Sequence, residues 1–176
     1  MESKAKLFGH AIHPMLIVFP LGLLSMSVIF DLIHFATGVG TWAQSSFWMI
    51  GAGIIGGLVA ALFGLLDWLA IPEGTRAKVI GRLHGGGNLA VVVLFIVSWL
   101  VRRPDQQHPN ALAFILSLVG VGLAVVTGWL GGELVERLGV GVDEGANLDA
   151  PNSLSHQPAG AGTASRAAGA TPRMQH

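Results

Sequence analysis

The chain of 176 residues contains no cysteine and few charged residues. Without cysteine, a disulfide framework, a zinc knuckle, an iron–sulfur cluster and a thiol nucleophile are all excluded. Charged residues make up 11% of the chain, against roughly 25% in an average soluble domain. Ten basic residues balance ten acidic ones, so the basic surface that a nucleic-acid-binding protein needs is also missing. Because 52% of the residues are hydrophobic, we expect lipid to be the main solvent.

The few charges avoid four long stretches of the chain. Asp, Glu, Lys and Arg are absent from residues 12–30, 41–66, 83–101 and 106–132. At about 1.5 Å per residue, each stretch can cross a hydrocarbon core about 30 Å thick as a helix, and in lipid only a helix or a closed barrel satisfies its own backbone. The sequence therefore predicts an all-α, integral membrane four-helix bundle. The predicted spans lie near residues 11–34, 46–69, 83–101 and 110–132.

The basic residues in the flanks predict the orientation. One side of the predicted bundle carries Lys4, Lys6, Arg76, Lys78, Arg82 and Arg137, and the other carries Arg102 and Arg103. The positive-inside rule then places both termini in the cytoplasm of a multi-pass protein of the bacterial inner membrane. Residues 1–138 form the predicted membrane domain. Residues 139–176 are rich in Gly, Ala, Pro, Asn and Ser and predict a disordered cytoplasmic tail.

Small residues recur at helical spacing in the second and fourth predicted spans. The two stripes are Gly53, Gly57, Ala60, Gly64 and Asp67, and Ala113, Ser117, Gly120, Ala124 and Gly131. Such stripes predict the faces on which membrane helices approach one another closely. In the first span, Pro20 predicts a kink.

Ionisable and polar groups inside the spans are the candidate functional residues, because their burial in lipid is costly. These residues are His13, Asp31 and His34 in the first span, Asp67 in the second, and His84 and Asn88 in the third. The predicted topology gathers His10, His13, Asp67 and His84 at the cytoplasmic boundary. It places Asp31 and His34 on the far side, where His108 lies in the loop before the fourth span.

Three interpretations of the cytoplasmic group remain open. In the first, His13 and His84 on facing helices are the axial ligands of haem b in a membrane redox subunit. In the second, His10, His13, Asp67 and His84 bind a transition-metal ion in a metal-handling protein or enzyme. In the third, the bundle is non-catalytic and these groups only fix helix packing. We expect no catalytic activity of the chain's own.

The remaining polar groups predict structural roles. We expect Asp67 to pair with Arg82 or His84, or to bond a helix end. Asp31 is expected to be hydrated or to cap a helix, and Glu133 to lie at a water-exposed helix end. The two arginines of the far side, Arg102 and Arg103, are expected to be interfacial anchors.

Three ordered motifs carry a resemblance to a known family. They are His-Pro-Met-Leu-Ile-Val-Phe-Pro-Leu-Gly-Leu-Leu at 13–24 followed by Asp31, Gly-Leu-Leu-Asp at 64–67, and Gly-Trp-Leu-Gly-Gly-Glu-Leu-Val at 128–135 followed by Gly-Val-Gly-Val at 139–142. Together they resemble a bacterial family of four-span membrane proteins, the two-two-three-one family of the domain-of-unknown-function series. The likeness covers roughly residues 7–142.

The resemblance implies a four-span membrane fold and points to a class of activity. Relatives in this family look to be fused in places to haem-c or Rieske-type redox modules, which implies electron transfer near quinone with other redox membrane proteins as partners. Its motif positions include His13, Asp31, Asp67, His84 and Glu133. The sequence departs from the family pattern after Leu-Val, where an aromatic and a basic residue are usual and Glu136 and Leu138 stand here. Four helices leave little room for a solute pore unless the protein forms a homo-oligomer.

Overall fold

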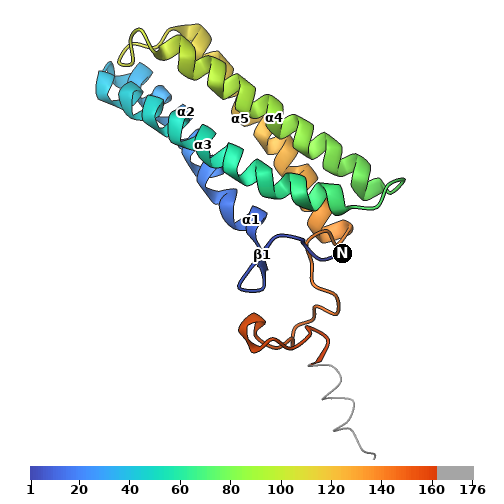
Figure 1. Cartoon of the computed structure of the whole chain (residues 1–176). Helices are drawn as coiled ribbons and strands as arrows, with labels where there is room; N and C mark the ends of the chain where they lie inside the picture. The colour runs from blue at the N-terminus through green and yellow to red at the C-terminus, as the bar shows by residue number, and fades with distance from the viewer. Residues whose placement is uncertain (162–176) are drawn as a thin grey trace, which may run out of the picture.

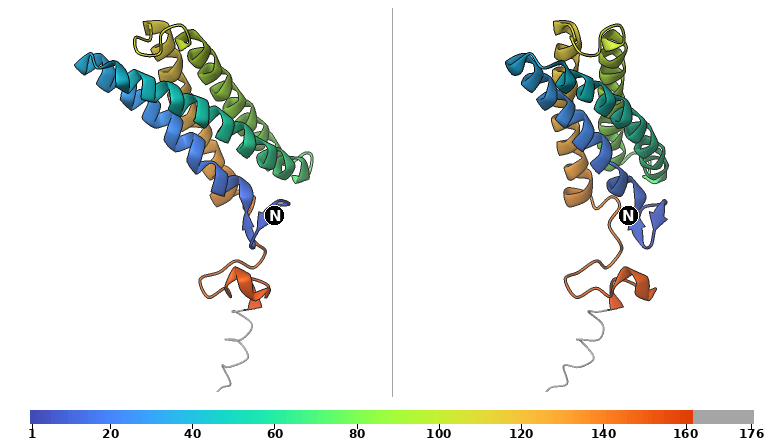
Figure 2. Two further views of the ribbon diagram at one scale, coloured as in Figure 1. Left: turned by 60° about the vertical axis from the view of Figure 1, so that its left-hand side comes forward. Right: turned by 90° about the vertical axis from the view of Figure 1, so that its left-hand side faces the viewer.

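The computed structural model describes residues 1–161, in which four long helices form a bundle of two antiparallel pairs (Figure 1). Helix α2 (Val18–Thr37) packs along α3 (Gly40–Ala70), and α4 (Arg76–Arg102) packs along α5 (Ala111–Gly132). Contacts of α3 with α4 and of α2 with α5 join the pairs. Both terminal segments lie at one end of the bundle, here called the terminal end (Figure 2). The opposite end, with residues 38–39 and 103–110, is the loop end.

The predicted four-span membrane fold is confirmed. The described residues contain four helices long and apolar enough to cross a membrane: Ile12–Thr37, Gly40–Ala70, Arg76–Arg102 and Ala111–Arg137. Each is longer than its predicted span. The connecting segments are correspondingly shorter, most of all between the first two long helices. There a connection of about ten residues was expected, and residues 38–39 form it. Gly38 permits this turn because it adopts φ 71°, a left-handed conformation that favours glycine.

The first span is broken near its start. Helix α1 (Ile12–Leu16) is followed by its C-cap Ile17, and α2 begins at Val18. Pro20 causes this interruption, because it has no N–H to donate to the carbonyl of Leu16, four residues earlier. The span that Pro20 was predicted to kink is therefore interrupted one helical turn before the proline.

Small residues bring the helices of each pair together, as their spacing predicts. A Cβ atom added to Gly53 of α3 would lie 2.6 Å from the Leu24 side chain of α2, and one added to Gly120 of α5 would lie 2.8 Å from the Phe95 ring of α4. Between the two ends of the bundle, the buried core is apolar. It consists of Leu24, Ile50, Ile54, Val91 and Phe95.

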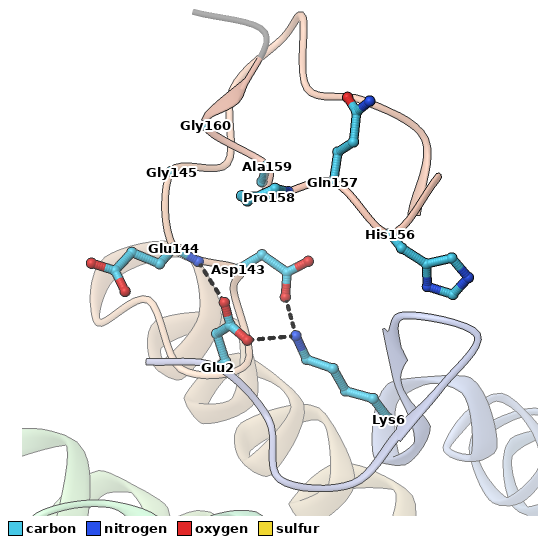
Figure 3. Close-up of a pocket in the computed structure, with 10 residues that line it drawn as sticks. All are labelled: Glu2, Lys6, Asp143, Glu144, Gly145, His156, Gln157, Pro158, Ala159 and Gly160. Carbon is cyan, nitrogen blue, oxygen red and sulfur yellow. Dashed lines mark hydrogen bonds and ion pairs between the residues drawn. The ribbon is translucent and has the colours of Figure 1, made fainter. Parts of the chain in front are cut away.

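The segment before the first helix attaches to the segment after the last one. It contains a short antiparallel hairpin, β1 (Lys6–Leu7) with β2 (His10–Ala11). Lys6 Nζ bonds Glu2 at 2.8 Å and also bonds Asp143, as Figure 3 shows. The hydrogen bond from Lys6 lowers the pKa of Glu2, and the bonds to Asp143 and Glu2 raise the pKa of Lys6.

The first residues of the predicted tail, which starts at residue 139, take part in this contact through Asp143. The described part, 139–161, includes a short 3₁₀ turn, Ser153–Ser155, labelled η2. The rest of the predicted tail, 162–176, lies outside the described residues.

Candidate functional site

Two histidines from opposite helix pairs meet near the terminal end of the bundle. His13 lies on α1, which continues into α2, and His84 lies on α4. Their ring centroids are 6.3 Å apart, and the ring planes are inclined at 86°. The structure therefore brings together the two residues that the sequence singles out as candidate haem ligands.

Each of the two rings directs Nδ1 at a backbone carbonyl. His13 Nδ1 lies 2.8 Å from the Ala60 oxygen of α3, and His84 Nδ1 lies 2.8 Å from the Thr127 oxygen of α5. A carbonyl can only accept a hydrogen bond, so Nδ1 carries the proton in each ring. In the neutral rings Nε2 is then the nitrogen with a free lone pair. Histidines that bind metals have this arrangement, because the bond at Nδ1 fixes both tautomer and ring orientation.

Asn88 lies one helical turn beyond His84 and occupies its second nitrogen. Asn88 Nδ2 is 3.1 Å from His84 Nε2, and the Thr127 hydroxyl donates to Asn88 Oδ1 at 2.8 Å. Because its oxygen accepts from Thr127, the Asn88 amide nitrogen donates to His84. A ligand that bound His84 Nε2 would have to replace this single hydrogen bond.

Glycines of the neighbouring helices leave room for both rings. A Cβ atom added to Gly64 of α3 would lie 2.9 Å from the His13 ring, and one added to Gly131 of α5 would lie 3.0 Å from the His84 ring. Glycine is therefore needed at these two positions for the rings to pack against the helix backbone. The small-residue stripes thus serve the histidine pair as well as helix packing.

His10, which the metal interpretation includes, is bound elsewhere. It lies on β2 with its side chain exposed, and its Nε2 is 3.3 Å from the Ser153 hydroxyl. Within residues 1–161 no three or more His, Asp or Glu side chains are grouped so as to hold a metal ion.

Asp67 binds the N-terminal segment rather than a neighbouring base. The Ser3 hydroxyl lies 2.8 and 2.9 Å from its two oxygens, and the Lys4 amide donates to Oδ1 at 2.8 Å. The expected pairing of Asp67 with Arg82 or His84 is therefore wrong. The chain before the first helix folds back over the terminal end and supplies donors that helix spacing alone does not reveal.

Glu133 is more covered than the sequence suggests. It begins the π-helical turn η1 (Glu133–Arg137) that follows α5, and it accepts a 2.6 Å hydrogen bond from Arg76 Nη2. Its side chain is only 17% exposed, so the expectation of a water-exposed group needs correction. The start of α4 lies beside the end of α5 and brings Arg76 over it.

A second polar group, at the loop end, is fully buried. Arg102 of α4 donates through Nη1 and Nη2 to the two carboxylate oxygens of Asp31 of α2, at 2.6 Å each, and neither side chain is exposed. Arg102 also bonds three serine hydroxyls at 3.2 Å: Ser46 of α3, Ser98 of α4 and Ser117 of α5. Each of the four long helices therefore contributes a side chain to this buried network.

The network corrects two expectations. Asp31 is neither hydrated nor a helix cap, and Arg102 is not an interfacial anchor. Both side chains turn inward because each supplies the charge that the other needs once lipid surrounds the bundle. Arg103, the next residue, is exposed and lies over the Trp99 ring at 5.1 Å, as an anchor would.

The far-side histidines are also close to each other. The His34 ring at the end of α2 and the His108 ring in the α4–α5 loop have centroids 6.2 Å apart. His34 is buried, whereas 68% of the His108 side chain is exposed. The bundle therefore carries one histidine pair near each end.

A comparison with protein families agrees with the membrane fold. The model of the DUF2231 family, described as a predicted membrane protein, matches residues 9–144. The chain belongs to the DUF2231 family. The matched range covers all four spans of the DUF2231 bundle, both histidine pairs and the buried ion pair, so the family resemblance seen in the sequence motifs is confirmed. No curated protein and no solved structure matches the chain.

Proposed function

We propose that this DUF2231 protein is a membrane electron-transfer subunit that binds haem b between His13 and His84. The observation that carries the proposal is the position of the two rings. Imidazoles bound on opposite sides of one metal, with nitrogen at about 2.0–2.1 Å, have ring centroids roughly 6.4 Å apart. The separation here is 6.3 Å, which matches the spacing of two imidazoles bound to one iron atom, and Asn88 would have to release His84 Nε2 for it to bind.

The donor set supports haem over a bare metal ion. The pair offers two imidazole nitrogens, which is the complete axial set of a six-coordinate b-type haem. An ion without water ligands usually takes three or four ligands from the protein, and at the terminal end His10 and Asp67 are engaged with Ser153 and with the N-terminal segment.

The surroundings of the pair fit the same group. The carbonyls of Ala60 and Thr127 hold each Nδ1 proton, which leaves Nε2 to face a metal. Gly64 and Gly131 keep the ring environment free of side chains. Asn88 would release His84 Nε2 by rotating its amide, which would also move its oxygen away from the Thr127 hydroxyl.

A bound haem would supply one-electron transfer, and the bundle would determine where it occurs. We place the terminal end at the cytoplasmic face of a bacterial inner membrane, because Lys4, Lys6, Arg76 and Arg82 lie there. At the loop end, the buried pairing with Asp31 leaves Arg103 as the exposed arginine. Quinone, or another redox membrane protein, would exchange electrons with the haem between His13 and His84. A homo-oligomer is compatible with the lipid-facing helix surfaces.

The test is a visible spectrum of the full chain, expressed with ample haem and purified in mild detergent. We expect a Soret band that shifts on reduction, and we expect His13→Ala and His84→Ala each to remove the six-coordinate spectrum. His10→Ala is the matched control, because this histidine lies at the same end but bonds Ser153, and it should leave the spectrum unchanged. Absence of the band in the wild-type protein, or its survival in both variants, would refute the proposal.

A second candidate is a metal-binding protein that uses the same pair, with His10 and Asp67 recruited by a movement of the N-terminal segment. The observation in its favour is that Ser3 and Lys4 hold Asp67 at the terminal end, so release of the segment would free a carboxylate. Metal analysis of the same samples distinguishes it: a stoichiometric metal lost in His13→Ala and in Asp67→Ala, without a Soret band, favours this candidate. Lower thermal stability alone would favour a purely structural role.

A further inference from the structure

The histidine pair at the loop end repeats the main features of the first pair. His34 comes from the first helix pair and His108 from the second, and their centroid separation of 6.2 Å is close to that of His13 and His84. The difference lies in the surroundings. His108 is in a loop with its side chain 68% exposed, whereas His13 and His84 lie on helices within the spans.

Both rings of the loop-end pair have Nδ1 engaged. His34 Nδ1 lies 3.1 Å from the Val39 carbonyl oxygen, and His108 Nδ1 lies 3.1 Å from Asp105 Oδ2. Oxygen acceptors at both Nδ1 atoms favour the tautomers in which Nε2 carries the free lone pair. The Asp105–His108 contact is the carboxylate–histidine arrangement found behind metal-binding imidazoles.

The position of Asp105 is itself fixed by the loop. Its Oδ1 accepts hydrogen bonds at 3.0 Å from the backbone N–H groups of Gln107 and His108. The carboxylate is therefore held in a turn that directs it at the His108 ring. The loop places an oriented imidazole beside His34, which α2 holds from the other side.

From this geometry we infer that His34 and His108 bind a divalent transition-metal ion at the loop end, with Asp105 orienting His108. Two imidazoles on one ion have centroids roughly 5.2 Å apart at a tetrahedral angle and roughly 6.4 Å apart when opposed. The observed 6.2 Å is close to the opposed arrangement, which Cu²⁺ and Ni²⁺ adopt in tetragonal sites with nitrogen and oxygen ligands. Because His108 is exposed, water can complete the coordination. This inference does not depend on haem binding at the other end.

A bound ion would connect the two helix pairs at the loop end. His34 ends α2, and His108 lies between α4 and α5, so a shared ion links elements that lie far apart in the sequence. The chain contains no cysteine, so no thiol of the protein competes for the ion or reduces it.

The test uses the full chain in detergent, with its affinity tag removed, and Cu²⁺ alone as the probe. At one equivalent of Cu²⁺, we expect an electron paramagnetic resonance spectrum with coupling to two imidazole nitrogens. His34→Ala and His108→Ala should each weaken binding by more than tenfold, and Asp105→Asn should weaken it by roughly 10–100-fold, as loss of an orienting partner does. His156→Ala, a histidine of the other end that is also exposed, is the control and should bind as the wild type does.

Two results would overturn the inference. One is equal Cu²⁺ affinity in the wild type, His34→Ala and His108→Ala; the other is a spectrum without coupling to two nitrogens. If the alanine variants fail to fold, carbethoxylation of the wild type decides: Cu²⁺ must protect the exposed His108 from the reagent while His156, also exposed, still reacts. His13→Ala should retain Cu²⁺ binding at the loop end, so failure of the haem proposal and failure of this one are distinguishable.

Discussion

Replacing either member of the buried ion pair should cost more stability than replacing both. We consider Asp31→Leu, Arg102→Met and the double variant, which exchange charged side chains for apolar ones of comparable size. In the wild type, the two guanidinium nitrogens lie 2.6 Å from the two carboxylate oxygens, and both side chains are fully buried. Neither partner can turn to water when the other is removed.

The size of the effect follows from what remains behind. In Asp31→Leu, Arg102 keeps the hydroxyls of Ser46, Ser98 and Ser117 as acceptors but has no opposite charge. Loss of one partner of a buried pair costs about 3–5 kcal/mol. Exchange of the whole pair for apolar groups is often neutral or stabilising. We therefore expect the free energy of unfolding of the double variant to lie within about 1–2 kcal/mol of that of the wild type. The double-mutant cycle formed by the wild type, the two single variants and the double variant should therefore give a coupling energy of several kcal/mol.

The assay is reversible unfolding in mixed micelles, followed by the fluorescence of the five tryptophans. Arg103→Met is the matched control, because this neighbouring arginine only lies over the Trp99 ring, and its loss should cost less than about 1 kcal/mol. Single variants that resemble this control would show that the pair does not stabilise the bundle. A double variant as unstable as the sum of the singles would show that the charges act independently, which contradicts the geometry.

Three further predictions follow from contacts at the terminal end. Gly64→Ala should destabilise the protein by about 1–3 kcal/mol, because the new methyl group meets the His13 ring at 2.9 Å, and the haem proposal further predicts a lower haem content. Gly122→Ala, with nothing within 4 Å of the added atom, should have neither effect. The link through Lys6 should depend on pH in two directions. Because the pKa of Glu2 is lowered, its contribution to the stability of this link is present above pH 4.5 and is lost as the pH falls. Because the pKa of Lys6 is raised, its contribution to the same stability is present below pH 10.5 and is lost as the pH rises. Spin labels on two introduced cysteines, one in each terminal segment, would report the distance between the two segments. A distance that stays constant from acid to alkaline pH would refute the predicted pH dependence. With one label in the N-terminal segment and the other near the end of α3, Asp67→Ala should lengthen the distance at neutral pH, because the Ser3 and Lys4 bonds are lost.

The fold could be predicted because a membrane imposes strong rules on sequence. Four uncharged stretches, each long enough to span, predict four helices, and the structure has them. Helix ends were less predictable. The rules assume that a charge marks the edge of the membrane, whereas α4 begins at Arg76 and includes Lys78 and Arg82 ahead of its predicted start at residue 83.

The histidine pair could be predicted from topology, but its environment could not. Alternation of the spans places His13 and His84 at the same end, and the cost of burying them marks both as candidates. Their carbonyl partners, Ala60 and Thr127, carry no signal in their side chains. The role of Asp31 could have been inferred, since the topology also places it at the same end as Arg102. What the sequence does not reveal is the rotation of each helix, which decides whether a charge faces lipid, water or another charge.

That rotation links the two ends of the bundle. Asp31 follows His13 by 18 residues, and Arg102 follows His84 by 18 residues. At about 3.6 residues per turn, 18 residues make five turns, so each histidine lies on the same side of its span as the charge at the other end, apart from the offset at Ile17. The rotation that brings Asp31 to Arg102 is therefore the rotation that brings His13 to His84, over an axial distance of about 27 Å. A buried charged pair loses its partner if either span rotates, and this costs energy. The ion pair thus orients the two spans, and the histidine pair at the terminal end depends on that orientation.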